Sequence, residues 1–89
     1  MNICFDINEC LIDREEKPIK SNIALLRVLS KKHKIYAWSG KGWGYAESWT
    51  RLLGLSPYLS GVLNKYGTFR PDIAFDDQEI DLGKLNIQL

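Results

Sequence analysis

The sequence predicts a small α/β fold with a mostly parallel sheet, and two observations support this prediction. Short apolar runs alternate along the chain with amphipathic helical patterns, which is typical of βαβ units with right-handed crossovers. Three of these runs end on a polar side chain: Ile3 to Phe5, Ile35 to Trp38 and Ile73 to Phe75. A buried parallel strand reads as a continuous apolar run because both of its faces are covered. The carboxyl ends of the three strands are therefore expected along one edge of the sheet.

Length and composition fit one domain of this kind over residues 1–89. The chain is 45% hydrophobic and 26% charged, which is ordinary for a globular protein. Its net charge of +1 gives no overall attraction to nucleic acid or to an anionic membrane. No apolar run approaches the ~20 residues of a membrane span. Cys4 and Cys10 lack the spacing of metal ligands or redox pairs, so we expect reduced structural thiols in a cytoplasmic protein.

The first strand delivers Asp6 to its carboxyl end, and Asn8 follows two positions later. An ionisable group at the end of a buried strand is half desolvated, which favours a role in binding a cation or a ligand. A turn-capping role for Asp6 is the alternative, because Asp is common in turns. The polar segment from Glu9 to Lys20 is expected to form an exposed loop or small hairpin, a candidate flap over the strand end.

Helical spacing of apolar residues predicts two helices. The first has Ser21 as its N-cap and ends near Lys32, where the basic cluster Lys31 to Lys34 favours the negative end of the helix dipole. A nucleic-acid patch is the alternative interpretation of this cluster. Gly54 ends the second helix, whose apolar positions are Tyr45, Ala46, Trp49, Leu52 and Leu53.

The remaining segments are a glycine-rich loop and two short strands. Ser39 is followed by three glycines within positions 40–44, which let backbone N–H groups approach an anion at the start of the second helix. This loop is neither a P-loop nor a dinucleotide-binding motif, because the spacing of its glycines differs. Gly61 to Leu63 is a candidate short strand, and the alternation from Leu85 to Leu89 is typical of an edge strand.

The strand that begins at Ile73 delivers two adjacent acids, Asp76 and Asp77, with Asp81 four positions further on. Together with Asp6 they would bring at least three carboxylates to one sheet edge. Such a cluster cannot stay ionised at neutral pH without a cation. Hard oxygen ligands that leave room for water and phosphate favour Mg²⁺.

These stretches together resemble the four motifs of the haloacid dehalogenase superfamily of phosphohydrolases, reduced to its core. That family has an apolar strand ending in Asp-x-Asp-x-Thr/Val, a second ending in Ser or Thr, a basic residue, and a strand ending in paired acids. The matching stretches here are Asp6 to Cys10, Ile35 to Ser39, Lys65, and Ile73 to Asp77 with Asp81. The resemblance implies a small three-layer Rossmann-like fold with strand order 5-4-1-2-3 and no cap domain. A capless core would suit a large or macromolecular phosphorylated substrate, or a site completed by another subunit in an oligomer.

The resemblance also implies roles in the site. Asp6 would be the nucleophile that forms an aspartyl-phosphate and would bind Mg²⁺ together with Asp77 and the backbone carbonyl of Asn8. Asp76 and Asp81 would support the metal ligands indirectly, through hydrogen bonds or bridging water. Phosphoryl oxygens would be held by Ser39, Gly40 and Lys65. Lys41 and Arg70 remain alternatives to Lys65 as the cation.

One departure from the family pattern affects the expected activity. The second Asp of the first motif protonates the leaving group and then activates water, and Asn8 cannot transfer a proton. The expectation is therefore a Mg²⁺-dependent phosphatase, slowed by Asn8, or a degenerate relative that binds metal and phosphate or a partner without turnover. A phosphoacceptor receiver domain is less favoured because its acidic pair lies on the first strand. Nucleic acid is not an expected partner.

Overall fold

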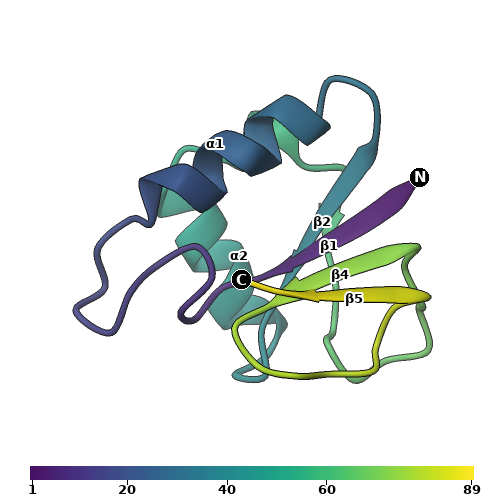
Figure 1. Ribbon diagram of the computed structural model, residues 1–89. Helices are drawn as coiled ribbons and strands as arrows, with labels where there is room; N and C mark the ends of the chain where they lie inside the picture. Colours follow the sequence, from purple (N-terminus) through teal and green to yellow (C-terminus); the bar gives the residue numbers. More distant parts are fainter.

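The computed structural model describes all 89 residues, and one sheet of five strands with two helices accounts for its regular structure (Figure 1). A short 3₁₀ turn, η1 (Ser56–Tyr58), precedes the third strand. The elements in chain order are β1 (Asn2–Asp6), α1 (Lys20–Leu29), β2 (Lys34–Trp38), α2 (Trp43–Leu52), β3 (Gly61–Val62), β4 (Ile73–Asp76) and β5 (Leu85–Gln88).

The sheet is parallel throughout, with β1 in its centre. Its order is β3-β2-β1-β4-β5. The chain runs from β1 towards one edge and then crosses to the other side of β1 to form β4, so the order reverses between β1 and β4. The register places Asp6 beside Trp38 and Phe5 beside Phe75. The predicted small α/β fold with a parallel sheet is confirmed.

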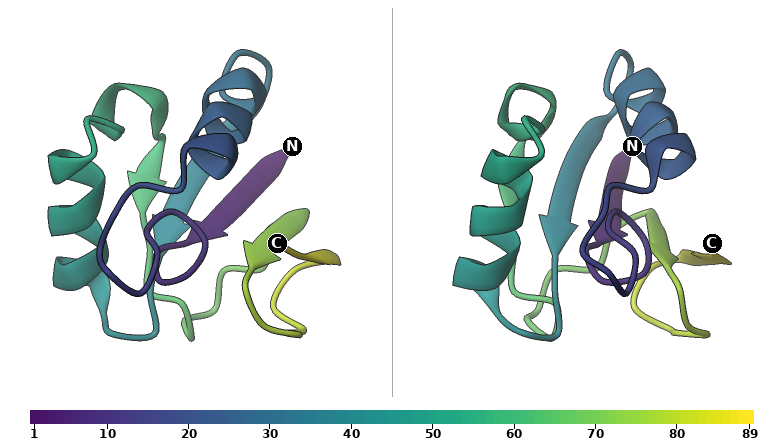
Figure 2. Two further views of the ribbon diagram at one scale, coloured as in Figure 1. Left: turned by 60° about the vertical axis from the view of Figure 1, so that its left-hand side comes forward. Right: turned by 90° about the vertical axis from the view of Figure 1, so that its left-hand side faces the viewer.

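Both helices pack on one face of this sheet (Figures 1 and 2). Two successive right-handed crossovers in the same direction put their helices on the same side. The prediction of three layers is wrong, because the connections that cover the opposite face, residues 63–72 and 77–84, contain no helix. Leu63, Phe69 and Ile80 from these connections supply the apolar cover instead.

The alternation of side chains along the strands divides the core into two clusters. On the helix side, Ile3 and Phe5 of β1 pack with Ile23 and Leu26 of α1. On the other side, Cys4, Trp38 and Ala74 form a smaller cluster under the two connections. Cys4 and Cys10 are buried and unpaired, as expected for structural thiols.

The helix boundaries follow local backbone chemistry. Ile19, not Ser21, occupies the N-cap position of α1, and no side chain caps this end. Asn22 in the first turn joins this end to the preceding loop, because its Nδ2 donates to the carbonyl oxygen of Cys10 at 2.7 Å. Gly42 precedes α2 with φ of 105°, and Gly54 follows it with φ of 69°, as predicted for the glycine that ends this helix. Neither ten-residue helix has the length and apolarity needed to cross a membrane.

A candidate metal site at the carboxyl edge of the sheet

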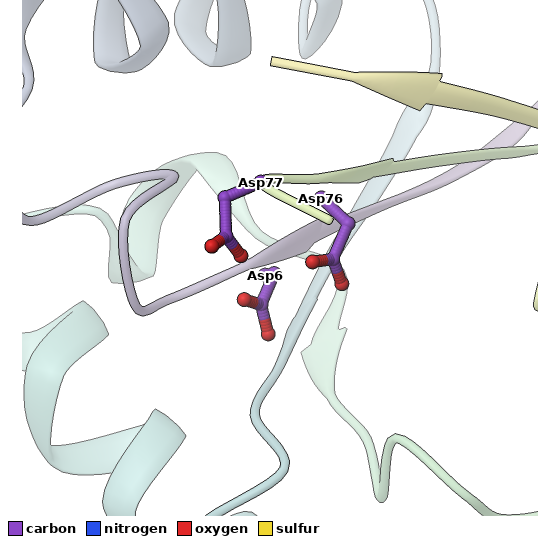
Figure 3. Close-up of side chains that lie close together, drawn as sticks. All are labelled: Asp6, Asp76 and Asp77. Carbon is purple, nitrogen blue, oxygen red and sulfur yellow. The ribbon is translucent and has the colours of Figure 1, made fainter. Parts of the chain in front are cut away.

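Three aspartates from the two central strands meet at the carboxyl edge of the sheet (Figure 3). Asp6 is the last residue of β1 and Asp76 the last of β4, while Asp77 begins the following connection. One carboxylate oxygen from each lies within 4.8 Å of the other two. The site occupies the point where the strand order reverses, which is where open parallel sheets bind their ligands.

Lys65 joins two of these carboxylates. Its Nζ lies 3.2 Å from Asp6 Oδ1 and 2.7 Å from Asp76 Oδ2. All three side chains are buried, with exposed fractions of 8%, 6% and 1% for Lys65, Asp6 and Asp76. Burial lowers the pKa of Lys65, but the hydrogen bond and charge of Asp76 together with the charge of Asp6 outweigh it, so the pKa lies above its ordinary value. The ammonium group is therefore a fixed positive charge at this edge.

One ammonium group does not neutralise three carboxylates. If all three acids are ionised, the cluster with Lys65 carries two uncompensated negative charges. Burial raises the pKa of Asp6 to about 6, and the charge of Asp76 adds to this while Lys65 opposes it. Burial, together with hydrogen bonding to Asp76 and Glu9, also raises the pKa of Asp77 to about 6. Without a cation, these two acids hold protons more tightly than exposed carboxylates do.

Asp76 tests whether the site suits a metal. Its Oδ1 accepts the backbone N–H of Gln78 at 3.1 Å. Its buried Oδ2 lies 2.7 Å from the Lys65 ammonium group. A buried carboxylate is costly unless a charge compensates it, and Asp76 shares its one ammonium group with Asp6. Asp6, Asp76 and Asp77 leave two negative charges uncompensated and together could hold a metal ion.

Asn8 is held at both ends of its side chain beside this cluster. Ser39 Oγ donates to Asn8 Oδ1 at 3.3 Å, and Asn8 Nδ2 donates to the hydroxyl oxygen of Tyr45 at 2.8 Å. The backbone N–H of Lys41 in turn donates to Ser39 Oγ at 3.1 Å. Residues from the ends of β1 and β2 and from the first turn of α2 are thereby linked in one hydrogen-bonded row.

The aspartates and Lys65 open into a pocket of about 670 Å³. Gly40 and Lys41 line it from the glycine-rich loop, and the exposed ring of Tyr66 lines it from the segment after β3. Asp13, Arg14 and Glu16 line it from the predicted flap, which forms an irregular loop stabilised by two isolated β-bridges. The pocket is open and mostly polar.

The flap is linked to the metal site through Glu9. Hydrogen bonding to Arg14 and to Asp77 lowers the pKa of Glu9, and its backbone has φ of 58°. Asp77 accordingly has contacts both with the sheet edge and with the flap.

The structure brings most of the residues expected at the site together. Asp6, Asn8, Gly40, Lys65, Asp76 and Asp77 line the pocket, and Ser39 lies directly beneath it, hydrogen-bonded to Asn8. Asp81 does not reach the site: its side chain is 84% exposed and forms an ion pair with Arg70. Arg70 is therefore engaged elsewhere, and Lys41 lies over the Tyr45 ring, so Lys65 is the cation that contacts Asp6.

Two tyrosines and an acid were not predicted at the site. Tyr45 fits the apolar spacing of α2, so its hydroxyl group could not be distinguished from a core position by pattern alone. Tyr66 and Glu9 lie in segments without periodicity. The sequence signal for all three is their proximity to predicted site residues: Tyr66 follows Lys65, Glu9 follows Asn8, and Tyr45 lies in the first turn after the glycine-rich loop.

Comparison of the chain with protein-family models, with curated proteins and with solved structures finds no match.

Proposed function

We propose that this protein is a Mg²⁺-dependent phosphohydrolase of the haloacid dehalogenase type, acting through an aspartyl-phosphate on Asp6. The observation that carries the proposal is the ion cluster of Asp6, Asp76 and Asp77 with Lys65 at the reversal point of a parallel sheet. The strand order and the position of the site agree with the resemblance in the four motifs. A metal would be held by Asp6, Asp77 and the backbone carbonyl of Asn8, with Asp76 behind them.

Each residue in the cluster has a distinct contribution to this reaction. Asp6 attacks the phosphorus atom, and Lys65 keeps Asp6 ionised and oriented through the contact with Oδ1. Asp76 in turn fixes Lys65 from the neighbouring strand. When bound, Mg²⁺ supplies positive charge that draws the phosphoryl group towards Asp6 and stabilises charge on its oxygens.

The phosphoryl oxygens would lie at the end of β2. Gly40 lines the pocket there, and a Cβ at this position would lie 3.6 Å from the Tyr66 hydroxyl. Backbone N–H groups at the start of α2 and the helix dipole favour an anion at this place. The open pocket supports a substrate whose phosphate enters the site while the rest of the molecule stays outside.

The proposal is tested by release of inorganic phosphate from p-nitrophenyl phosphate with and without Mg²⁺. We expect metal-dependent hydrolysis in the native protein and its loss, by at least ~10²-fold, in Asp6→Asn, which keeps the shape of the side chain but removes the nucleophile. Asp81→Asn is the matched control, because this aspartate lies on the surface away from the pocket. Hydrolysis that Asp6→Asn leaves unchanged would refute the proposal.

A second candidate function is binding of metal and phosphate without turnover. The observation in its favour is Asn8, whose amide occupies the place of the family's acid/base carboxylate and is hydrogen-bonded at both ends. Asn8→Asp distinguishes the two functions. A gain in hydrolysis over a measurable native rate supports the enzyme, whereas Mg²⁺ and phosphate binding with no turnover in either form supports the binding protein.

A further inference from the structure

The proposed reaction needs a proton donor that Asn8 cannot provide. When a phosphate ester is cleaved, the departing oxygen takes the electron pair of the P–O bond, and an alkoxide leaves slowly unless it is protonated. Among the groups that line the pocket, the Tyr45 hydroxyl is the one in direct hydrogen-bond contact with Asn8. We propose that Tyr45 is a catalytic residue that gives its hydroxyl proton to the leaving-group oxygen; this inference rests on the phosphohydrolase function proposed above.

A row of hydrogen bonds fixes the direction of the Tyr45 hydroxyl. It starts at the backbone N–H of Lys41, which can only donate, so Ser39 Oγ accepts there and its own hydrogen points to Asn8 Oδ1. This orients the amide of Asn8, and its NH₂ group donates to the Tyr45 oxygen at 2.8 Å. The hydroxyl oxygen is an acceptor in that contact, and its single hydrogen has no acceptor within the protein. The hydrogen is therefore available to a substrate.

Positive charge and a hydrogen-bond donor lie around the Tyr45 side chain. The Nζ of Lys41 lies 5.0 Å from the centre of the Tyr45 ring. Tyr45 is in the first turn of α2, where the helix dipole presents its positive end. The Asn8 amide donates directly to the oxygen that would carry the charge. Asparagine at position 8 is then a partner that suits a phenolate, because a carboxylate there would repel it.

The two chemical steps balance with these groups. In the first, an Asp6 oxygen forms a bond to phosphorus, the bond from phosphorus to the ester oxygen breaks, and the Tyr45 proton passes to that oxygen, which leaves as an alcohol. In the second, water attacks the phosphorus of the aspartyl-phosphate and its proton passes to the Tyr45 phenolate. The bond from phosphorus to Asp6 breaks, and inorganic phosphate leaves with both Asp6 and Tyr45 restored.

The experiment compares leaving groups. kcat/KM is measured with Mg²⁺ for p-nitrophenyl phosphate, whose leaving group needs no proton, and for ethyl phosphate, whose leaving group does. We expect Tyr45→Phe to lose ~10²-fold or more on ethyl phosphate, as for removal of a general acid, and only a few-fold on p-nitrophenyl phosphate. Tyr58→Phe, on the exposed turn η1, is the matched control. An equal loss on both substrates, or none on either, would overturn the inference.

A second variant excludes a merely structural effect of Tyr45→Phe. We expect Asn8→Asp introduced into Tyr45→Phe to restore hydrolysis of ethyl phosphate, because the carboxyl group then supplies the proton and Tyr45 is no longer needed. Failure of this rescue in a double variant whose thermal unfolding midpoint matches that of the native protein would overturn the inference.

The activity of the native protein on the two esters distinguishes failure of this inference from failure of the proposed function. Activity on p-nitrophenyl phosphate without any on ethyl phosphate would overturn the role of Tyr45 and leave the phosphohydrolase function in place. No Mg²⁺-dependent hydrolysis of either ester would overturn both.

Discussion

At the scale of single residues, the charge of the site depends on Lys65, which lies 59 positions from Asp6 in the sequence. Lys65 is buried against Asp6 and Asp76 and contacts both. A buried ion pair contributes little net stability compared with an apolar pair, but removing one partner leaves a charge buried without compensation. The single cation is therefore important both for folding and for the ionisation of Asp6.

The substitution Lys65→Met tests how much Lys65 contributes to the stability of the fold. We expect the free energy of unfolding of the metal-free protein to fall by about 3 kcal/mol, the lower end of the range for breaking a buried ion pair, measured by urea unfolding at pH 7. Adding Asp76→Asn should recover part of the loss, because it removes one of the uncompensated charges. Lys32→Met, at an exposed site, is the control. A loss no larger than that of the control would mean that the ion pair is not retained in solution.

The residues of the site differ in how far sequence could predict them. Asp6 and Asp77 were predicted because strand ends in a parallel sheet converge whatever the details of packing, whereas Lys65 was chosen from the family resemblance as its basic residue. Asp81 was misplaced because the direction of its side chain depends on the irregular turn after β4, which carries no periodic signal. Tyr45 was assigned to the core by its helical spacing, and its ring does pack beside the core, but its hydroxyl group reaches Asn8.

At the scale of elements, the connection from β4 to β5 packs closely on the sheet. A Cβ on Gly83 would lie 3.0 Å from the backbone nitrogen of Ala74 and 3.0 Å from the carbonyl oxygen of Leu85. The side chain of Asn86 closes the same turn, accepting from the backbone N–H groups of Leu82 and Gly83. This turn sets the position of β5 at the edge of the sheet.

Gly83→Ala is expected to destabilise the protein, because the added methyl group meets backbone atoms that cannot move independently. A loss of about 1–3 kcal/mol is typical of such overpacking, and chemical denaturation measures it. Gly44→Ala is the matched substitution and is expected to change stability in the opposite direction. Gly44 lies within α2, with open space around the new methyl group, so alanine there should stabilise the protein by about 0.5–1 kcal/mol. Equal effects of the two substitutions would contradict the close packing at Gly83.

The existence of the elements was easier to predict from the sequence than the residues at which they begin. The strands and both helices were predictable because apolar runs and helical spacing reflect burial directly. Ser21 was misassigned as the N-cap of α1, because the helix starts one residue before it, where the preceding loop is tied back by hydrogen bonds such as that from Ile19 N–H to the carbonyl oxygen of Leu11. The third layer was expected from the family resemblance. Connections of about ten residues have no room for a full helix with its loops.

At the scale of the whole molecule, the surplus of buried acid makes stability depend on pH and on metal. Asp6 and Asp77 have pKa values raised to about 6 in the folded metal-free protein, against 3.8 for the unfolded reference. Between these values the folded state binds more protons than the unfolded state. The contribution of the two acids to stability therefore decreases as pH rises from about 4 to about 6, and stays low above that.

We accordingly expect the metal-free protein to resist urea better at pH 5 than at pH 7, and Mg²⁺ to reverse this order because it binds the ionised carboxylates. The double variant Asp6→Asn with Asp77→Asn should lose both the pH dependence over this interval and the response to Mg²⁺. A metal-free native protein that is more stable at pH 7 than at pH 5 would contradict the assignment of raised pKa values to these two acids.

The two faces of the sheet are covered differently, and we expect the face without helices to open more readily. Lys65 belongs to the connection over the face that has no helices, and a segment without regular hydrogen bonding opens locally at a lower free energy than the helix-covered core. Amide hydrogens of residues 64–70 should therefore exchange with solvent before those of β1. Local opening of this segment would take the ammonium group away from Asp6 and Asp76 while the sheet remains intact.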